Sequence, residues 1–187
     1  MENGQACHGR VMVLRHSFVS RLEDFIEGRE VELSGHHVTF CGVGGATVNK
    51  LRKKLRMQNL ESFCRVYMEV GTNDLRNHSA DIVISDIWSL VARLRSNGAP
   101  QMILGQVLFR TRRWVWGTSL QEFSKRVRQL NAKVETWMPE RSDVFFWRHQ
   151  YLHSAHHMAR DGVHFSNHFQ SKYWRSVRGG ITTHLQY

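Results

Sequence analysis

The residues in this sequence that are best suited to catalysis are a serine, an asparagine and a closely spaced aspartate and histidine. Two residues separate Asp161 from His164, so the carboxylate can accept from one ring nitrogen while the other nitrogen faces outward. The side-chain amide of Asn73 can donate a hydrogen bond to a developing negative charge. The Ser17 hydroxyl becomes a nucleophile once a positioned imidazole takes its proton. Together these groups are suited to acyl transfer from an ester to water.

Each of these groups also has a purely structural explanation. Ser17 follows an apolar run and precedes a helical pattern, where serine is a common N-cap. Asn73 lies in Gly-Thr-Asn-Asp (71–74), which can make a turn and cap the next helix. Asp-Gly-Val-His (161–164) can be a turn that ends in a surface histidine. A catalytic interpretation therefore depends on whether the fold brings these segments together.

Alternating apolar patterns predict the elements that would do so. Short apolar runs predict buried strands, and recurrence at helical spacing predicts helices between them. The predicted strands are 11–14, 38–41, 66–70, 102–109 and 144–147, and the predicted helices are 18–26, 48–55, 82–94, 120–134 and 165–177. This alternation predicts an α/β fold, a three-layer sandwich with a central parallel five-stranded sheet. The carboxyl ends of its strands would open at one edge, where such sheets bind ligands.

The length of 187 residues and the hydrophobic content of 41% predict one domain over 11–187, preceded by a flexible tail at 1–10. No apolar run reaches the length of a membrane span, and the first residues lack the pattern of a signal peptide. We therefore expect an intracellular, cytoplasmic protein. Three cysteines, two of them in apolar runs, argue against a disulfide framework.

Histidines are concentrated between positions 149 and 168. On a helix, His149, His153 and either His156 or His157 would share one face, as metal ligands do. No cysteine or acidic ligand pattern accompanies them, so we expect no metal and no cofactor.

A net charge of +10 predicts attraction to polyanions, of which nucleic acid is one; a basic surface can equally serve solubility. One basic segment is the predicted helix around Lys50–Arg56, for which a solvated face is the simplest account. The other is 110–117, which contains Arg110 together with Arg112, Arg113, Trp114 and Trp116. This second segment could bind bases and phosphates, cover a substrate cleft as a flap, or form a surface loop whose tryptophans pack down. A nucleotide-binding Rossmann protein is disfavoured because no phosphate-cradling spacing is present.

The order of these segments resembles the SGNH hydrolases, which include the GDSL-type esterases and lipases, over nearly the whole chain from Val11 to Val177. The resemblance rests mainly on Gly-Thr-Asn-Asp (71–74) and Asp-Gly-Val-His (161–164). It implies a flavodoxin-like sheet order. It also implies Ser17 as nucleophile, His164 as general base and Asp161 as the group that orients it. The implied oxyanion hole is the backbone N–H of Ser17, the backbone N–H of Gly45 and the amide of Asn73.

The chain departs from the family where Arg15-His16 replaces the usual Gly-Asp before the serine. The resemblance thus implies either an esterase for a small ester or acetylated substrate, or an impaired SGNH domain that binds nucleic acid. The residues around 16–22, with those of the glycine-rich loop and 161–164, also resemble SGNH domains of some metazoan mobile elements. Glu69, a carboxylate in an apolar strand, is expected to need a partner such as His16 or an arginine.

Overall fold

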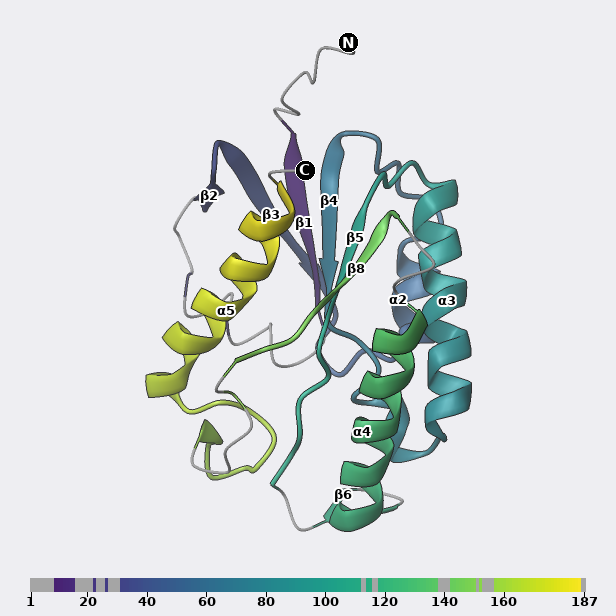
Figure 1. The fold of residues 1–187 in the computed structure, drawn as a ribbon, viewed down its shortest axis with the longest axis vertical. Helices are drawn as coiled ribbons and strands as arrows, with labels where there is room; N and C mark the ends of the chain where they lie inside the picture. Colours follow the sequence, from purple (N-terminus) through teal and green to yellow (C-terminus); the bar gives the residue numbers. More distant parts are fainter. Residues whose placement is uncertain are drawn as a thin grey trace.

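The computed structural model describes residues 9–15, 22, 26, 31–111, 114–115, 118–137, 142–150, 152 and 157–185. Its central sheet has six strands in the order β2-β3-β1-β4-β5-β8 (Figure 1). The strands are β1 (Arg10–Arg15), β2 (Glu32–Leu33), β3 (His36–Gly42), β4 (Phe63–Met68), β5 (Met102–Gly105) and β8 (Val144–Trp147). Five of them pair in parallel, as predicted, and only β2 is antiparallel within the described sheet. The prediction of an α/β fold with a parallel five-stranded sheet is confirmed.

Helices cover both faces of the sheet and complete the predicted three layers (Figure 1). The helices α2 (Val48–Lys54), α3 (Ala80–Ser96) and α4 (Leu120–Trp137) lie on one side, and α5 (Asn167–Leu185) lies on the other. Because successive strand residues point to opposite faces, Val11 and Val13 pack in the core on the α5 side. Met12 and Leu14 pack in the core beneath α2, α3 and α4.

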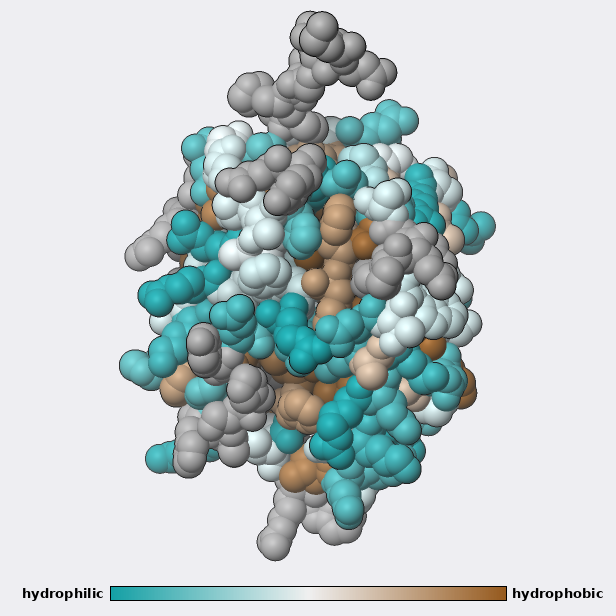
Figure 2. All heavy atoms as spheres, in the orientation of Figure 1, coloured by the Kyte–Doolittle hydropathy of each residue, from teal (hydrophilic) through white to brown (hydrophobic). Residues whose placement is uncertain are grey.

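The two-sided covering explains why the central strands are largely apolar and buried. All six residues of β4 and all four of β5 are buried, as expected for parallel strands with helices on both faces. The helices, by contrast, are amphipathic: α4 buries Phe123, Val127 and Leu130 on one face. Figure 2 shows hydrophilic side chains over α4 and a narrow apolar band between the α4 and α5 sides of this face.

The boundaries of α3 follow from its capping residues. Ser79 is the N-cap, and its side chain accepts a hydrogen bond from the Ile82 N–H. The helix ends before Asn97-Gly98, as predicted, and Gly98 adopts a φ of 92°. The closing helix α5 begins at Asn167, two residues later than expected, and continues to Leu185.

Two strand predictions need correction. The strand expected at 102–109 ends at Gly105, because the side-chain amide of Asn131 on α4 binds both the N–H and the carbonyl of Val107. The short strand β2 was not predicted. It pairs with β3 through a tight turn at Ser34-Gly35, and both turn residues have positive φ, as in the hairpin turns that suit twisted strands.

The helix expected at 18–26 falls mostly outside the described residues. Leu22 and Ile26, which are described, are helical and buried. The first strand begins at Arg10, the last residue of the expected tail, and residues 1–8 of that tail are outside the described residues, so the domain boundaries stay a prediction. No helix within the described ranges is long and apolar enough to cross a membrane.

Candidate active site

Hydrogen bonds join four loops at the carboxyl edge of the sheet, which lies at the bottom of Figure 1. The Asn73 amide donates to the carbonyl of Ala46 at 2.9 Å, which links the loop after β4 to the loop after β3. Arg110 donates to the Asn73 side-chain oxygen at 2.8 Å. The next residue, Thr111, donates its N–H to the Gly162 carbonyl at 2.9 Å. The fold therefore connects the Asn73 segment to the Asp161–His164 segment, which lie about ninety residues apart in sequence.

Asp161 and His164 form the hydrogen-bonded pair that their spacing predicts. The Asp161 Oδ2 lies 2.7 Å from the His164 Nδ1. Its Oδ1 accepts from the backbone N–H groups of Val163 and His164, both at 2.9 Å. Gly162 between them has a φ of 61°, which favours glycine. With Nδ1 held by the carboxylate, Nε2 is the nitrogen through which the ring can take a proton from a nucleophile.

The charge of Asp161 is stabilised where it lies. Burial alone would raise its pKa, but hydrogen bonds from the His164 ring and from the backbone of His164 and Val163 outweigh burial. The pKa of this carboxyl is consequently held below its usual range. The side chains are only partly exposed, 20% for His164 and 35% for Asp161. A carboxylate that stays ionised can orient the imidazole and stabilise an imidazolium during a reaction.

The Asn73 amide is held from both ends. Because its oxygen accepts from Arg110 and one N–H donates to Ala46, the amide orientation is fixed and a second N–H is left on the same nitrogen. Gly71 makes the preceding turn with a φ of 103°, and an added Cβ would lie 3.0 Å from the Val83 side chain. This packing positions a hydrogen-bond donor at the sheet edge.

Asp74 has a structural role, but it binds the start of the preceding helix α2, whereas the turn-and-cap alternative expected a cap on the next helix, whose N-cap is Ser79. Both of its carboxylate oxygens lie 3.2 Å from the backbone N–H of Val48, the first residue of α2. Burial raises the pKa of Asp74 to about 6, against the opposing effect of the Val48 hydrogen bond. The Gly-Thr-Asn-Asp segment therefore serves both purposes: Asp74 anchors α2, while Asn73 faces the loops.

Gly45 lies in an exposed turn closed by a hydrogen bond from the Ala46 N–H to the Val43 carbonyl. Its φ is 67°, and nothing lies within 4 Å of the position that a Cβ would occupy. The neighbouring Ala46 carbonyl is the group that Asn73 binds, so Gly45 and Asn73 lie close together at the edge. Its assignment to the oxyanion hole stays a prediction.

Arg110 is a site residue that the sequence did not identify as such. It was grouped with the basic segment, yet its side chain is buried, and its guanidinium lies over the Phe123 ring, 5.5 Å from the centroid. Of the proposed flap or nucleic-acid residues, Arg112, Arg113 and Trp116 lie outside the described residues, and Trp114 begins a two-residue strand, β6 (Trp114–Val115). That strand pairs with β7 (Thr118–Ser119).

Glu69 sits in a fully buried polar cluster beside the site. Its Oε2 accepts from the Tyr173 hydroxyl at 2.8 Å and lies 3.0 Å from the His149 Nε2. These two partners are ones that the sequence did not indicate; the expected partner His16 lies outside the described residues, so that expectation stays a prediction. His149 was considered only as a metal candidate. No sequence signal would have paired residues 80 and 104 positions from Glu69.

Ser17 also lies outside the described residues. Strand β1 ends two residues before it, at Arg15, which is in register with Gly42 at the end of β3. The parallel strands β1 and β3 thus end together, immediately before Ser17 on one side and the glycine-rich loop on the other.

No family model and no curated protein matches the chain. Solved structures do: a GDSL-like lipase from Bacteroides thetaiotaomicron has a TM-score of 0.73 at 16% identity over 100% of this chain and 92% of that one. The lipase/acylhydrolase from Enterococcus faecalis has a TM-score of 0.63 at 17% identity, over 94% and 96%. A carbohydrate esterase family 3 structure from Talaromyces cellulolyticus has a TM-score of 0.64 at 14% identity, over 95% and 96%. Together with the sheet order and the helices on both faces, these matches show that the chain has the fold of the GDSL/SGNH hydrolases.

Proposed function

We propose that this protein is a serine hydrolase that cleaves a small ester or an O-acetyl group, with Ser17 as nucleophile. The observation that carries the proposal is the hydrogen bond between Asp161 and the His164 Nδ1, at 2.7 Å, at the sheet edge where the Asn73 amide is also fixed. A fold shared with lipases, acylhydrolases and esterases supports the same chemistry.

In the proposed reaction, His164 Nε2 takes the proton from the Ser17 hydroxyl as its oxygen attacks the ester carbonyl carbon. Asp161 holds the ring and stabilises the imidazolium. The tetrahedral oxyanion is stabilised by the backbone N–H groups of Ser17 and Gly45 and by the Asn73 amide. His164 then gives its proton to the departing alcohol, which leaves an acyl-serine. Water, activated by the same imidazole, releases the acid and restores Ser17.

Arg110 extends the proposal to a positioning residue. Its hydrogen bond to the Asn73 oxygen, at 2.8 Å, fixes the orientation of the amide whose nitrogen is proposed to donate to the oxyanion. A positive charge behind the amide also polarises it, which strengthens the remaining N–H as a donor. Removing one oxyanion donor costs roughly 100- to 1000-fold in kcat in enzymes of this kind of chemistry. We expect the loss of Arg110 to cost less, because the amide itself remains.

The test is hydrolysis of p-nitrophenyl acetate and butyrate by the wild type, Ser17→Ala and His164→Ala, with circular dichroism to establish folding. His168→Ala is the matched control, since His168 is exposed in the first turn of α5, four residues after His164. Turnover that is lost in Ser17→Ala and His164→Ala but kept in His168→Ala supports the proposal. Turnover that is unchanged by Ser17→Ala contradicts it.

The alternative, an impaired SGNH-fold domain that binds nucleic acid, would apply if Arg15-His16 has removed activity. A basic groove among the described residues favours a nucleic-acid partner independently of catalysis, and it is taken up below. The similarity to SGNH domains of mobile elements stays a prediction.

A further inference from the structure

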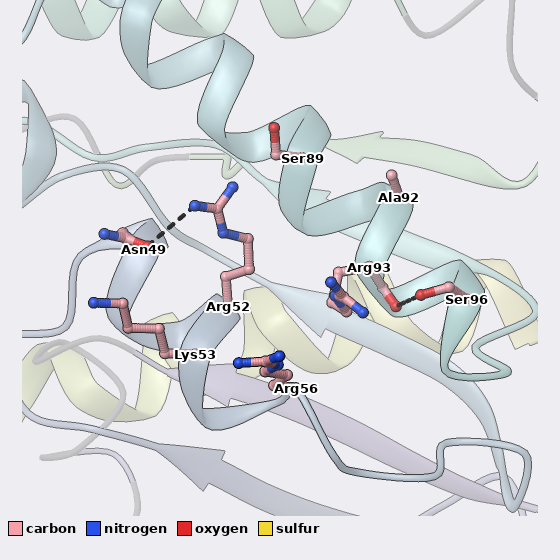
Figure 3. A pocket seen from close by; sticks show the side chains of 8 residues that line it. All are labelled: Asn49, Arg52, Lys53, Arg56, Ser89, Ala92, Arg93 and Ser96. Carbon is pink, nitrogen blue, oxygen red and sulfur yellow. Dashed lines mark hydrogen bonds between the residues drawn. The ribbon is translucent and has the colours of Figure 1, made fainter.

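A groove of about 500 Å³ lies between α2 and α3, on the outer surface of the helical layer. The side chains of Arg52 and Arg56 extend into it from α2 and the turn after it, and Arg93 extends toward them from α3 (Figure 3). Lys53 also lines it. Four cations therefore border one small space, together with neutral side chains only.

These four charges have no acidic partner among the described residues. Across the part of the chain that the structure describes, no carboxylate forms an ion pair with any of them. Arg52 instead donates to the neutral Asn49 side chain at 3.2 Å. Other surface cations do pair with acids, and Arg95 with Asp143 is one example. Arg95 is also on α3, but it projects from a different side of the helix than Arg93 does.

The helix dipoles explain only part of this arrangement. Cations in the last turn of a helix are stabilised by about 0.3 to 1 kcal/mol each, and the groove cations of both helices are in or just after their last turns. The helix dipoles therefore do not account for the fact that the cations of the two helices face one another across a groove. Like charges one helical turn apart, such as Arg52 and Arg56, repel unless an anion lies between them. The arrangement is therefore suited to binding an anion.

The groove is separate from the candidate active site. The helices α2 and α3 both begin near the loops that carry Gly45 and Asn73 and run toward the opposite edge of the sheet (Figure 1). Arg93 is thirteen residues after the start of α3 at Ala80, which places it about 20 Å along the helix from that end. A ligand bound by Arg93 would therefore lie away from the catalytic edge, although Asn49, four residues after Gly45, lines the end of the groove nearer to it.

We propose that this groove binds the phosphodiester backbone of a nucleic acid, without reading its bases. Guanidinium groups bind phosphate oxygens through two parallel hydrogen bonds, and three arginines are available here. The lining residues are charged, polar or alanine, so the groove offers phosphate contacts and hydroxyl donors but no aromatic platform for a base. A net charge of +10 adds long-range attraction for a polyanion.

The experiment measures binding of a fluorescein-labelled 20-nucleotide RNA and a 20-base-pair DNA duplex by fluorescence anisotropy, from 50 to 200 mM NaCl. The test variant is Arg52→Gln/Arg56→Gln/Arg93→Gln. The matched control is Lys125→Gln/Arg128→Gln/Arg178→Gln, which removes three exposed positive charges outside the groove. Four phosphate contacts predict that duplex affinity falls roughly 100-fold over this salt range, since each contributes about −0.9 to the logarithmic slope. The test variant should bind more weakly and lose about 2.7 from the slope, while the control should change it little.

Three results would overturn the proposal. One is the absence of binding to either probe at 50 mM NaCl by folded protein. Another is an equal loss of affinity in the test and control variants, which would assign binding to overall charge. The third is binding to phosphatidylserine vesicles but to neither oligonucleotide, which would make the surface a membrane contact, with the 90% exposed Met57 beside Arg56 as its apolar part. Ester hydrolysis measured on the same variants keeps this result distinct from the fate of the catalytic proposal.

Discussion

The buried carboxylate of Glu69 should be among the most important single groups for stability. It lies just after β4 with no exposed surface and binds Tyr173 of α5 and His149 after β8. His149 in turn lies 2.9 Å from the Ser176 hydroxyl of α5 through its Nδ1. The cluster thus connects the carboxyl ends of β4 and β8 to α5 through hydrogen bonds, next to the loops of the candidate site.

The expected cost of Glu69→Ala can be worked out from these contacts. The substitution removes an acceptor that serves the Tyr173 hydroxyl at 2.8 Å and the His149 ring at 3.0 Å, and it leaves a cavity among buried polar groups. Breaking a buried, hydrogen-bonded pair by removing one partner costs about 3 to 5 kcal/mol. Burial first, and Glu69 second, raise the pKa of Tyr173 well above its usual value, so its hydroxyl stays a donor that needs an acceptor. Glu69→Gln keeps the volume and one acceptor, and should cost about 1 to 3 kcal/mol.

Urea unfolding of the wild type, Glu69→Ala, Glu69→Gln and Tyr173→Phe, followed by circular dichroism, gives these free energies by linear extrapolation. The double variant Glu69→Gln/Tyr173→Phe completes a cycle that isolates the Glu69–Tyr173 hydrogen bond, for which we expect a coupling energy of about 1 to 2 kcal/mol. A cost below about 1 kcal/mol for Glu69→Ala, or a coupling energy near zero, would refute the reasoning.

Three further predictions concern single residues. Asp161→Asn keeps the side-chain shape but removes the charge facing the imidazole, so kcat for p-nitrophenyl acetate should fall roughly 1000-fold with little change in KM; a loss below 10-fold would contradict this. Asp74 has a pKa of about 6 in the folded state, above its ordinary value, so the folded state binds the proton more tightly and its stability is lost as the pH rises from about 4 through 6. Between pH 4 and pH 7, the free energy of unfolding of Asp74→Asn should therefore rise by roughly 2 to 3 kcal/mol relative to that of the wild type, as measured by urea titration. A difference between the two proteins that does not change with pH would count against this reasoning. Gly180→Ala would place a Cβ 2.7 Å from the Trp147 ring and should cost about 1 to 3 kcal/mol, whereas Gly179→Ala, at 3.3 Å, should cost much less; equal thermal shifts would oppose this packing account.

Much of the fold could be predicted from the sequence because the signals were local. A strand covered on both faces is apolar throughout, so runs such as those that became β1 and β4 stand out from the amphipathic helices between them. The Asp161–His164 pair was also predictable, since both residues lie in one short loop and Gly162 supplies the bend.

The remaining features depend on contacts between distant segments. The end of β5 is set by Asn131, which binds Val107 from 24 residues further along the chain, and no pattern around 102–109 reveals this contact. The partners of Glu69 come from two other elements, and Arg110 looked like part of an exposed basic segment although it is buried against Asn73. In each case a polar side chain satisfies a buried group far away in sequence, and such pairings become visible only once the elements are packed.

The central claim, that Ser17 is a nucleophile activated by His164, is tested most directly by covalent labelling. The protein is incubated with a fluorophosphonate, which reacts with activated serines, and the adduct is mapped by peptide mass spectrometry in the wild type and in His164→Ala. The account predicts one dominant adduct on Ser17 in the wild type and a labelling rate at least 100-fold lower in the variant, because the hydroxyl then lacks its base. Folded wild-type protein that carries no adduct on Ser17, or that labels there equally fast without His164, would contradict it.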